Sequence, residues 1–261
     1  MPEHQVLGGL MFSKLIFTFV ALIFLSSSVI SAEMDSKTLK AYQYLDDLAI
    51  QADTDKSSKF HNYTKVYANY FNHIRKNSIK FLEIGIQKGN SVKLWESYFP
   101  NAELHFIDID DSFIKYYSSR SLYHYVDQEN FAEMDQLASS LGGNFDVIID
   151  DGGHTMNQQI VSFQALFPYV NSGGLYIIED LHTSYWREYG GHGKIGAPLV
   201  GVGTCIEFLK DRIDDLNYTA GVTECADFNK TPKWLKTNLN LYQSHIDSIH
   251  FHQSLCIIIK K

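Results

Sequence analysis

The sequence predicts an α/β protein with a mostly parallel, seven-stranded β-sheet, helices on both faces and an antiparallel hairpin at the C-terminal end. Three observations lead to this fold class. The chain has 261 residues, 45% of them hydrophobic and 20% charged, so it can bury a core of its own. Between Ile79 and Ile178, short apolar runs alternate with helical stretches, which is the pattern of strands linked by crossover helices. Each of these runs also ends at or near an acidic residue.

Two helices are expected before the sheet. Residues 37–50 place apolar side chains such as Leu45 and Leu48 at helical spacing. After the polar segment Asp53–Ser58, a second helix is predicted over Tyr63–Arg75. These helices would form a preface to the sheet.

The strands and helices of the sheet follow in order along the chain. Parallel strands are predicted at Ile79–Ile84, Leu104–Ile107, Leu122–Val126, Phe145–Ile149 and Leu175–Ile178. Helices are predicted at Ser91–Tyr98, from Asp108 through Ile114, at Phe131–Leu141 and at Asn157–Tyr169. A glycine-rich loop, Gly190–Gly203, precedes a helix near Cys205–Leu216. Residues Ile246–Phe251 and Leu255–Ile259 then form the antiparallel hairpin.

The N-terminal segment has the composition of a targeting sequence. An apolar core, Leu15–Leu25, follows Lys14 and leads into a serine-rich stretch that ends at Ala32, which is typical of a secretory signal peptide. The apolar core is shorter than the roughly 20 residues of a spanning helix, but an uncleaved signal anchor is an alternative. We expect a secretory or membrane-anchored protein, or a cytoplasmic one if the leader does not function. The chain is thus divided into a leader at 1–32, a helical preface at 33–76 and one domain at 77–261.

Modification sites depend on whether the chain is exported. N-x-S/T sequons, which matter only in a glycosylating compartment, begin at Asn62, Asn217 and Asn229. The three cysteines, Cys205, Cys225 and Cys256, form no CxxC pair, which argues against a disulfide scaffold and a thiolate zinc site. A single Cys205–Cys225 bridge stays open.

The charge of the chain argues against nucleic acid as a partner. It carries 22 Lys and Arg residues against 30 Asp and Glu residues, a net charge of −8, and contains no basic run. A small-molecule acceptor is the expected partner, with membrane contact only through the N-terminal segment. Homo-oligomerisation is left open.

A glycine motif at the end of the first strand points to a nucleoside cofactor. Glu83–Gly89 has the form E-x-G-x-x-x-G, in which Gly85 permits a tight turn and Gly89 lets a ligand approach the helix N-terminus. Asp108 ends the next strand, where a carboxylate can bind two ribose hydroxyls. Asp127-Gln128, after the third strand, could hold the adenine edge. The G-x-G-x-x-G spacing of nicotinamide sites is absent, which favours a cofactor without pyrophosphate, such as S-adenosylmethionine.

Acidic residues at the next two strand ends predict a metal site. Asp151 and Glu179-Asp180 follow consecutive strands of the expected sheet, and neighbouring strands lie about 4.8 Å apart. Three carboxylates select a hard cation such as Mg²⁺. His154, beside them at a helix start, is the candidate general base for a chelated hydroxyl. The alternative is that these residues are separate helix caps and solvated turns.

Several segments resemble one enzyme family. They are Phe81–Ser91 (FLEIGIQKGNS), Ile148–His154 (IIDDGGH) and Gly173–Asp180 (GGLYIIED), with further similarity in Thr54–Tyr67, Tyr98–Ile109 and Ser248–Lys261. Together they resemble the metal-dependent class I S-adenosylmethionine O-methyltransferases, in particular the enzymes that methylate macrolide deoxysugars and are related to the cephalosporin hydroxylase family. The paired DDGGH and IIED motifs are the specific part.

The resemblance implies a Rossmann-like methyltransferase fold and a role for each matched residue. It implies Mg²⁺ on Asp151, Glu179 and Asp180, with His154 as the base. It puts the cofactor's methionine portion near Glu83 and Gly85, its ribose on Asp108 and its adenine by Asp127 and Gln128. We also assign Gly89 and Asp150 to the cofactor site.

The function expected from these residues is Mg²⁺-dependent methylation of a hydroxyl on a sugar or another polyhydroxylated acceptor. Tyr185, Trp186 and the loop around His192 would cover the site. Two alternatives stay open. One is a hydroxylase-like or hydrolytic enzyme with the same metal cluster, and the other is a non-catalytic glycan- or partner-binding protein on the same fold.

Overall fold

The computed structural model describes residues 35–191 and 203–261. The predicted leader at 1–32 and the loop around His192 lie outside the described residues. The chain divides into two units, 1–39 and 40–261, and only the start of helix α2 (Ser36–Ala52) is described in the first. The account that follows concerns the second unit.

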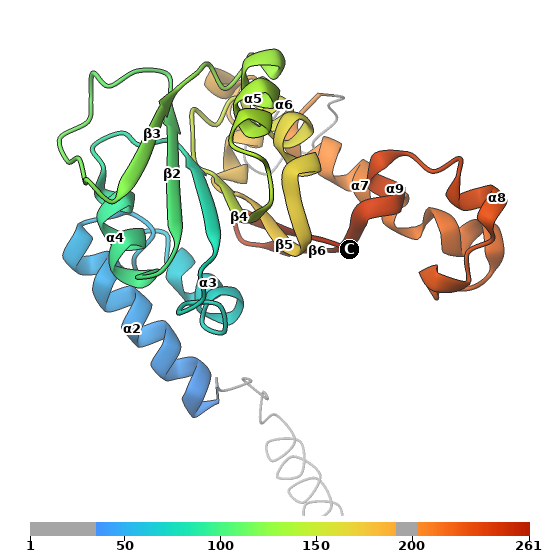
Figure 1. Cartoon of the computed structure of the whole chain (residues 1–261), viewed down its shortest axis with the longest axis horizontal. Coiled ribbons are helices and arrows are strands. Elements are labelled where there is room, and N and C mark those ends of the chain that lie inside the picture. The colour runs from blue at the N-terminus through green and yellow to red at the C-terminus, as the bar shows by residue number, and fades with distance from the viewer. Residues whose placement is uncertain (1–34, 192–202) are drawn as a thin grey trace, which may run out of the picture. The chain divides into compact units, whose positions relative to one another are not determined.

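A seven-stranded sheet forms the centre of this unit (Figure 1), as the sequence predicts. Its strand order is β3-β2-β1-β4-β5-β7-β6. The first five strands are parallel, while β7 pairs antiparallel with both β5 and β6. The strands are β1 (Lys80–Ile84), β2 (Glu103–Asp108), β3 (Ser121–Tyr125), β4 (Phe145–Asp150), β5 (Val170–Ile178), β6 (Ile246–His252) and β7 (Leu255–Lys260).

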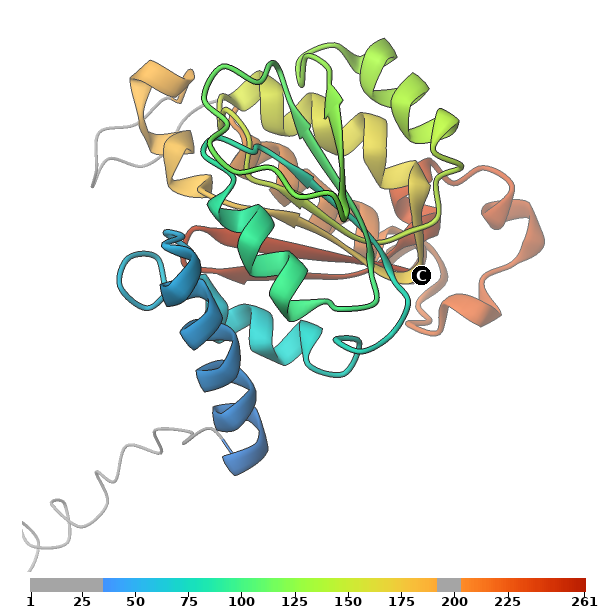
Figure 2. The ribbon, with the colours of Figure 1, turned by 60° about the vertical axis from the view of Figure 1, so that its left-hand side comes forward.

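Helices cover both faces of the sheet (Figure 2). The first apolar cluster joins one face of the sheet to α2, α3 (Tyr63–Phe71) and α4 (Asn90–Tyr98). The second joins the other face to α5 (Phe131–Ser140), α6 (Met156–Leu166) and α7 (Cys205–Thr223). Successive strand residues alternate between the clusters, so Phe81 packs in the first and Leu82 in the second.

Short elements complete the unit. The 3₁₀ turns are η1 (Phe167–Tyr169), η2 (Leu181–Tyr185), η3 (Arg187–Tyr189) and η4 (Phe228–Lys230), and the short helices are α8 (Lys233–Lys236) and α9 (Leu241–His245). Among the helices of the described residues, none is long and apolar enough to cross a membrane.

The structure corrects one predicted helix and shifts the ends of two others. Residues 109–120 are all described and contain no helix, although the sequence pattern suggested one through Ile114. Asp110 instead accepts hydrogen bonds from the backbone and hydroxyl of Ser112, a local turn that competes with helix formation. Helix α3 ends at Phe71 rather than Arg75, and α7 continues to Thr223 rather than ending near Leu216.

Candidate functional site

A cavity of about 490 Å³ opens at the carboxyl ends of the parallel strands. Parallel α/β sheets bind their ligands at this edge. Six of the residues predicted for the site line it: Gly85, Asp108, Asp127, Gln128, Asp151 and His154. Glu83, Gly89, Asp150, Glu179 and Asp180 do not belong to its lining.

The glycine turn after β1 is shaped by close backbone contact. Gly85 has φ +96°, and a Cβ at this position would lie 2.0 Å from the carbonyl oxygen of Asp151. Gly89 also has a positive φ and directly precedes α4. The Asp108 carboxylate accepts hydrogen bonds from the backbone N–H groups of Ile86 and Gln87, at 2.8 and 3.1 Å. Asp108 therefore both stabilises the glycine turn and lines the cavity.

The two residues expected near the adenine behave differently. Asp127 is exposed and accepts a hydrogen bond from the backbone of Glu129. Gln128 is buried and donates to Asp150 at 2.6 Å, while its amide oxygen accepts from the backbone N–H of Gly153 at 3.0 Å. Burial raises the pKa of Asp150 to about 7. Asp150 thus does not line the cavity and contacts it through Gln128 and the backbone N–H of Gly152, which both line it.

The three predicted metal ligands, Asp151, Glu179 and Asp180, fall into two overlapping groups rather than one. Asp151, His154 and Asp180 make the first, with His154 Nε2 3.5 Å from Asp180 Oδ2 and 3.8 Å from Asp151 Oδ1. Asp151 belongs also to the second group, with the buried Glu83 and Glu179. We call the four acids and the histidine of these two groups the acid cluster: Glu83, Asp151, His154, Glu179 and Asp180.

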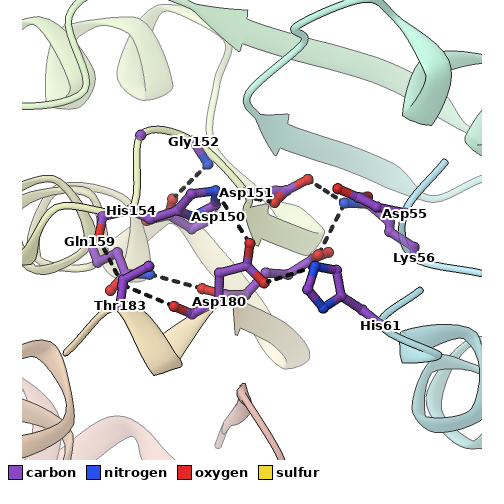
Figure 3. Close-up of polar contacts among 12 residues, drawn as sticks. Asp55, Lys56, His61, Asp150, Asp151, Gly152, His154, Gln159, Asp180 and Thr183 are labelled. Atoms are coloured by element: carbon purple, nitrogen blue, oxygen red, sulfur yellow. Dashed lines mark hydrogen bonds and ion pairs between the residues drawn. The ribbon is translucent and has the colours of Figure 1, made fainter. Parts of the chain in front are cut away.

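Lys56 is the main residue of this site that sequence analysis does not identify. Its side chain is fully buried, and its ammonium contacts Asp151 (Figure 3). The ammonium also lies 3.0 Å from Glu179 Oε2 and 3.6 Å from Glu83 Oε1. Burial alone would lower the pKa of Lys56, but attraction by these carboxylates raises it well above its usual value. The only sequence signal for Lys56 is its place in the family-like segment Thr54–Tyr67.

Two tyrosines of α3 complete the contacts of the acids. Tyr67 donates to Glu179, and Tyr63 donates to Asp180 at 2.6 Å. Burial, together with repulsion by Asp151, raises the pKa of Glu179 well above its usual value. Burial would also raise the pKa of Asp180, but the hydrogen bond from Tyr63 and the neighbouring histidines lower it.

His154 occupies a strained position beside the acids. Its φ is +58°, a left-handed conformation that side chains rarely adopt and that clusters at functional sites. Thr155 caps α6 directly after it, so the helix start fixes the backbone there. Nδ1 is buried without a hydrogen-bond partner among the described residues, while Nε2 faces the two aspartates.

A second cavity, of about 930 Å³, is lined by residues that contact Asp180. Tyr63 and His182, which both approach the Asp180 carboxylate, belong to its lining. Most other lining residues are aromatic or apolar and include Phe60, Leu181, Tyr185, Ile206, Ile213 and Phe251. Of the two residues predicted to cover the site, Tyr185 lines this second cavity, whereas Trp186 belongs to neither lining.

The residues present fit the groups that the fold class binds. Oxygen donors from several strand ends suit a divalent cation, and Glu83 Oε2 is buried without a partner among the described residues. At Gly85, the space that a Cβ would fill is taken by the backbone of Asp151 and Gly152 after β4. The glycine turn and this backbone therefore lie in direct contact, and both line the cavity. This strand order, with a glycine turn and acidic strand ends, defines a class I methyltransferase-like protein.

Comparison with known proteins identifies which methyltransferases this chain is similar to. The chain is 35% identical over 202 residues to L-olivosyl-oleandolide 3-O-methyltransferase of Streptomyces antibioticus, covering 75% of this chain and 50% of that protein. It is 32% identical over 203 residues to mycinamicin VI 2''-O-methyltransferase of Micromonospora griseorubida, covering 75% and 49%. No family model matches the chain.

A solved structure agrees with these relatives. The MycE methyltransferase of the mycinamycin pathway, in complex with Mg and SAH, superposes with a TM-score of 0.71 at 30% identity, covering 83% of this chain and 53% of that one. The chain belongs to the class I S-adenosylmethionine O-methyltransferase family. It spans about half the length of the curated relatives that it matches.

Proposed function

We propose that this chain is a Mg²⁺-dependent O-methyltransferase that moves a methyl group from S-adenosylmethionine to a hydroxyl of a sugar or a similar polyhydroxylated small molecule. One observation carries the proposal. The acid cluster adjoins two cavities, because Asp151 and His154 line the smaller one and two residues that contact Asp180 line the larger one. A transferase needs such an arrangement, because donor and acceptor must meet at one point.

The linings of the two cavities differ in the same way as the two substrates, the S-adenosylmethionine donor and a sugar-bearing acceptor. The smaller contains the glycine turn and Asp108, which suit the nucleoside and methionine parts of the donor. The larger is lined mostly by aromatic or apolar residues, with histidines near Asp180, which suits a sugar ring and an apolar body attached to it. Two relatives, L-olivosyl-oleandolide 3-O-methyltransferase and mycinamicin VI 2''-O-methyltransferase, are named for acceptors of this kind, which supports the proposal.

The residues of the cluster would divide the chemistry among them. His154 would take the proton of the acceptor hydroxyl through Nε2, which already faces both aspartates. Asp151, Glu179 and Asp180 would hold the cation, and Tyr63 and Tyr67 would orient Asp180 and Glu179. Mg²⁺ would supply Lewis acidity that lowers the pKa of the acceptor hydroxyl.

Calorimetric titration with S-adenosylhomocysteine tests the donor site. We expect micromolar-range binding by the wild type and a loss of about tenfold to a hundredfold in Asp108→Asn, because a charged acceptor for two hydroxyls is removed. Asp110→Asn is the matched control, since Asp110 is exposed, lies two residues away and does not line the cavity. Absence of binding by the wild type would favour the hydroxylase-like or the non-catalytic alternative.

Methyl transfer itself is tested with S-adenosylmethionine and a panel of glycosides, with mass-spectrometric detection of a methylated product. We expect His154→Ala to bind S-adenosylhomocysteine like the wild type yet to lose product formation by at least about a hundredfold. Full activity in His154→Ala would contradict the role of His154. An equal loss of cofactor binding would show that the substitution disturbs the fold of the cavity.

We also propose that residues 1–32 direct the chain into the secretory pathway or anchor it at a membrane. The apolar core and the preceding Lys14 support this, and the exposed sequon residues Asn217 and Asn229 would then be open to glycosylation. Asn62 is half-buried and accepts a hydrogen bond from Tyr42, so we expect it to stay unmodified. Mass spectrometry of the native protein checks the proposal. A new N-terminus near Glu33 indicates cleavage, an intact leader in the membrane fraction indicates an anchor, and an intact soluble protein contradicts both.

A further inference from the structure

Lys56 brings a positive charge into the part of the molecule where carboxylates converge. Its ammonium contacts acids at the ends of three different strands: Glu83 within β1, Asp151 after β4 and Glu179 after β5. Lysine is almost never fully buried unless it is paired. Here it is fully buried and has three carboxylates within 4 Å, so it is the counter-cation of these acids in the described structure.

The backbone around Lys56 is held in place independently of the acids. The carbonyl of Lys56 accepts a hydrogen bond from Thr64, the second residue of α3, at 3.1 Å. Two residues on, the backbone N–H and hydroxyl of Ser58 both donate to Asp46 of α2, at 2.7 and 2.5 Å. These hydrogen bonds fix the backbone position of Lys56, so its ammonium stays close to the acid cluster.

Lys56 and a divalent cation make use of the same carboxylates. Glu179 already directs one oxygen to Lys56 and the other to Tyr67, and Asp151 directs one oxygen to Lys56. The second oxygen of Asp151 faces His154, whose Nε2 also lies 3.5 Å from Asp180. A cation bound there would lie a few ångströms from the ammonium. Like charges at such a distance repel strongly in a buried site.

We propose that Lys56 is a built-in counter-cation that keeps Glu83, Asp151 and Glu179 together without metal and weakens the binding of a divalent cation to the same cluster. This inference rests on the metal dependence in the proposed function. Without Lys56, the three acids would repel each other in the metal-free protein, and a cation would relieve that repulsion on binding. The lysine thus lets the strand ends adopt their arrangement before a metal arrives.

Titration with MnCl₂ alone, a probe for the Mg²⁺ site, tests the inference by calorimetry and by thermal unfolding. We expect Lys56→Met to bind Mn²⁺ at least about tenfold more tightly than the wild type. Its melting temperature should fall markedly in metal-free buffer and recover largely with Mn²⁺, because binding to the folded state stabilises it. Lys59→Met, an exposed lysine three residues away, is the matched control and should behave as the wild type in both measurements. Lys56→Arg should also remain close to the wild type, because it keeps the charge.

The outcomes separate this inference from the proposed function. Wild-type binding of Mn²⁺ with equal or weaker binding by Lys56→Met overturns the inference alone, as does an equal loss of melting temperature with and without metal. Absence of binding in both proteins overturns the metal dependence and the inference with it. If Lys56→Met does not fold, the comparison is made between Glu83→Gln and the double variant Glu83→Gln/Lys56→Met, which buries one acid fewer. The double variant should again bind Mn²⁺ about tenfold more tightly than its parent.

Discussion

At the scale of single residues, Gly85 joins two strand ends of the sheet. It follows β1 in a left-handed conformation, and its Cα faces the backbone after β4 so closely that a Cβ would overlap the Asp151 carbonyl oxygen. Backbone cannot move aside as the end of a flexible side chain can. Any residue larger than glycine must therefore push apart the glycine turn and the segment that carries Asp151.

Substitution of Gly85 by alanine tests this contact against a matched glycine. Gly142 also has a positive φ, but nothing lies within 4 Å of a Cβ built there. We expect Gly142→Ala to lower the free energy of unfolding by about 1–2 kcal/mol, the cost of the left-handed conformation alone. Gly85→Ala should cost clearly more and abolish binding of S-adenosylhomocysteine. Urea unfolding and calorimetry measure both effects, and equal costs for the two variants would contradict a specific contact at Gly85.

Site residues could be predicted from sequence when they lie at the end of a strand, because the sheet then determines where they lie in the fold. Asp108 ends β2, and Asp151 and His154 follow β4, so a parallel sheet brings them to one edge. Lys56 could not be found in this way. It lies in a polar segment that reads as a surface turn, and it meets Asp151 only through a contact across 95 residues of sequence. Such a contact depends on how the α2–α3 connection packs, which has no local signal.

At the scale of elements, β2 and β3 are joined by a histidine pair that links stability to pH. His105 Nδ1 lies 2.9 Å from His124 Nε2, and the other nitrogen of His105 lies 2.6 Å from Glu103. Burial lowers the pKa of both histidines, and in His105 it outweighs the attraction of Glu103. In the unfolded chain their pKa values return to about 6.5. The unfolded state therefore takes up these protons at a higher pH than the folded state.

From this difference we expect the free energy of unfolding to decrease as pH falls below about 6.5. His124→Gln should make that decrease shallower, because one lowered pKa is removed and His105 loses a neighbour whose charge would repel its own. His73→Gln, at an exposed histidine, is the control and should keep the wild-type slope. Urea unfolding on both sides of about pH 6.5 provides the measurement. An unchanged slope in His124→Gln would show that the pair does not carry the effect.

The segment between α2 and α3 is an element whose order depends on one buried acid. Asp46 accepts hydrogen bonds from the backbone and side chain of Ser58 and from the hydroxyl of Thr64. Asp46→Ala should leave those donors unpaired and lower the free energy of unfolding by about 1–3 kcal/mol. Amide hydrogen exchange should also rise in residues 55–64 more than in the sheet. Asp47→Ala, at the exposed neighbour, should change neither quantity, and uniform exchange in Asp46→Ala would contradict a local role.

Local competition explains why one helix between strands was mispredicted while the strands were found. Strands β1, β4 and β5 are buried on both faces, and their continuous apolar runs are visible in the sequence. Residues 109–114 combine exposed Ile109 and Phe113 with the Asp110 turn, so no apolar face favours a helix. Ends such as Phe71 in α3 also depend on tertiary packing and not on propensity alone.

At the scale of the whole molecule, the two apolar clusters share the sheet between them. Ile257 of β7 belongs to the first cluster and its neighbour Ile258 to the second, and the same alternation holds in β5 for Ile177 and Ile178. The same strands contribute side chains to both clusters, so unfolding these strands would expose both clusters to water. Residues 40–261 should therefore unfold in a single cooperative transition.

Independent probes of the two clusters test this cooperativity. Trp95 is buried in the first cluster, whereas Cys205 and Cys256 are buried in the second. In a variant with Trp186→Phe, Trp234→Phe and Cys225→Ser, Trp95 fluorescence and the reactivity of the two thiols each report one cluster alone. We expect both signals to change at the same urea concentration, because the strands that bury Trp95 on one face bury the thiols on the other. Thiol reactivity at a lower urea concentration would mean that α6 and α7 detach first, and the acid cluster would then depend on the first apolar cluster and Lys56 for its order.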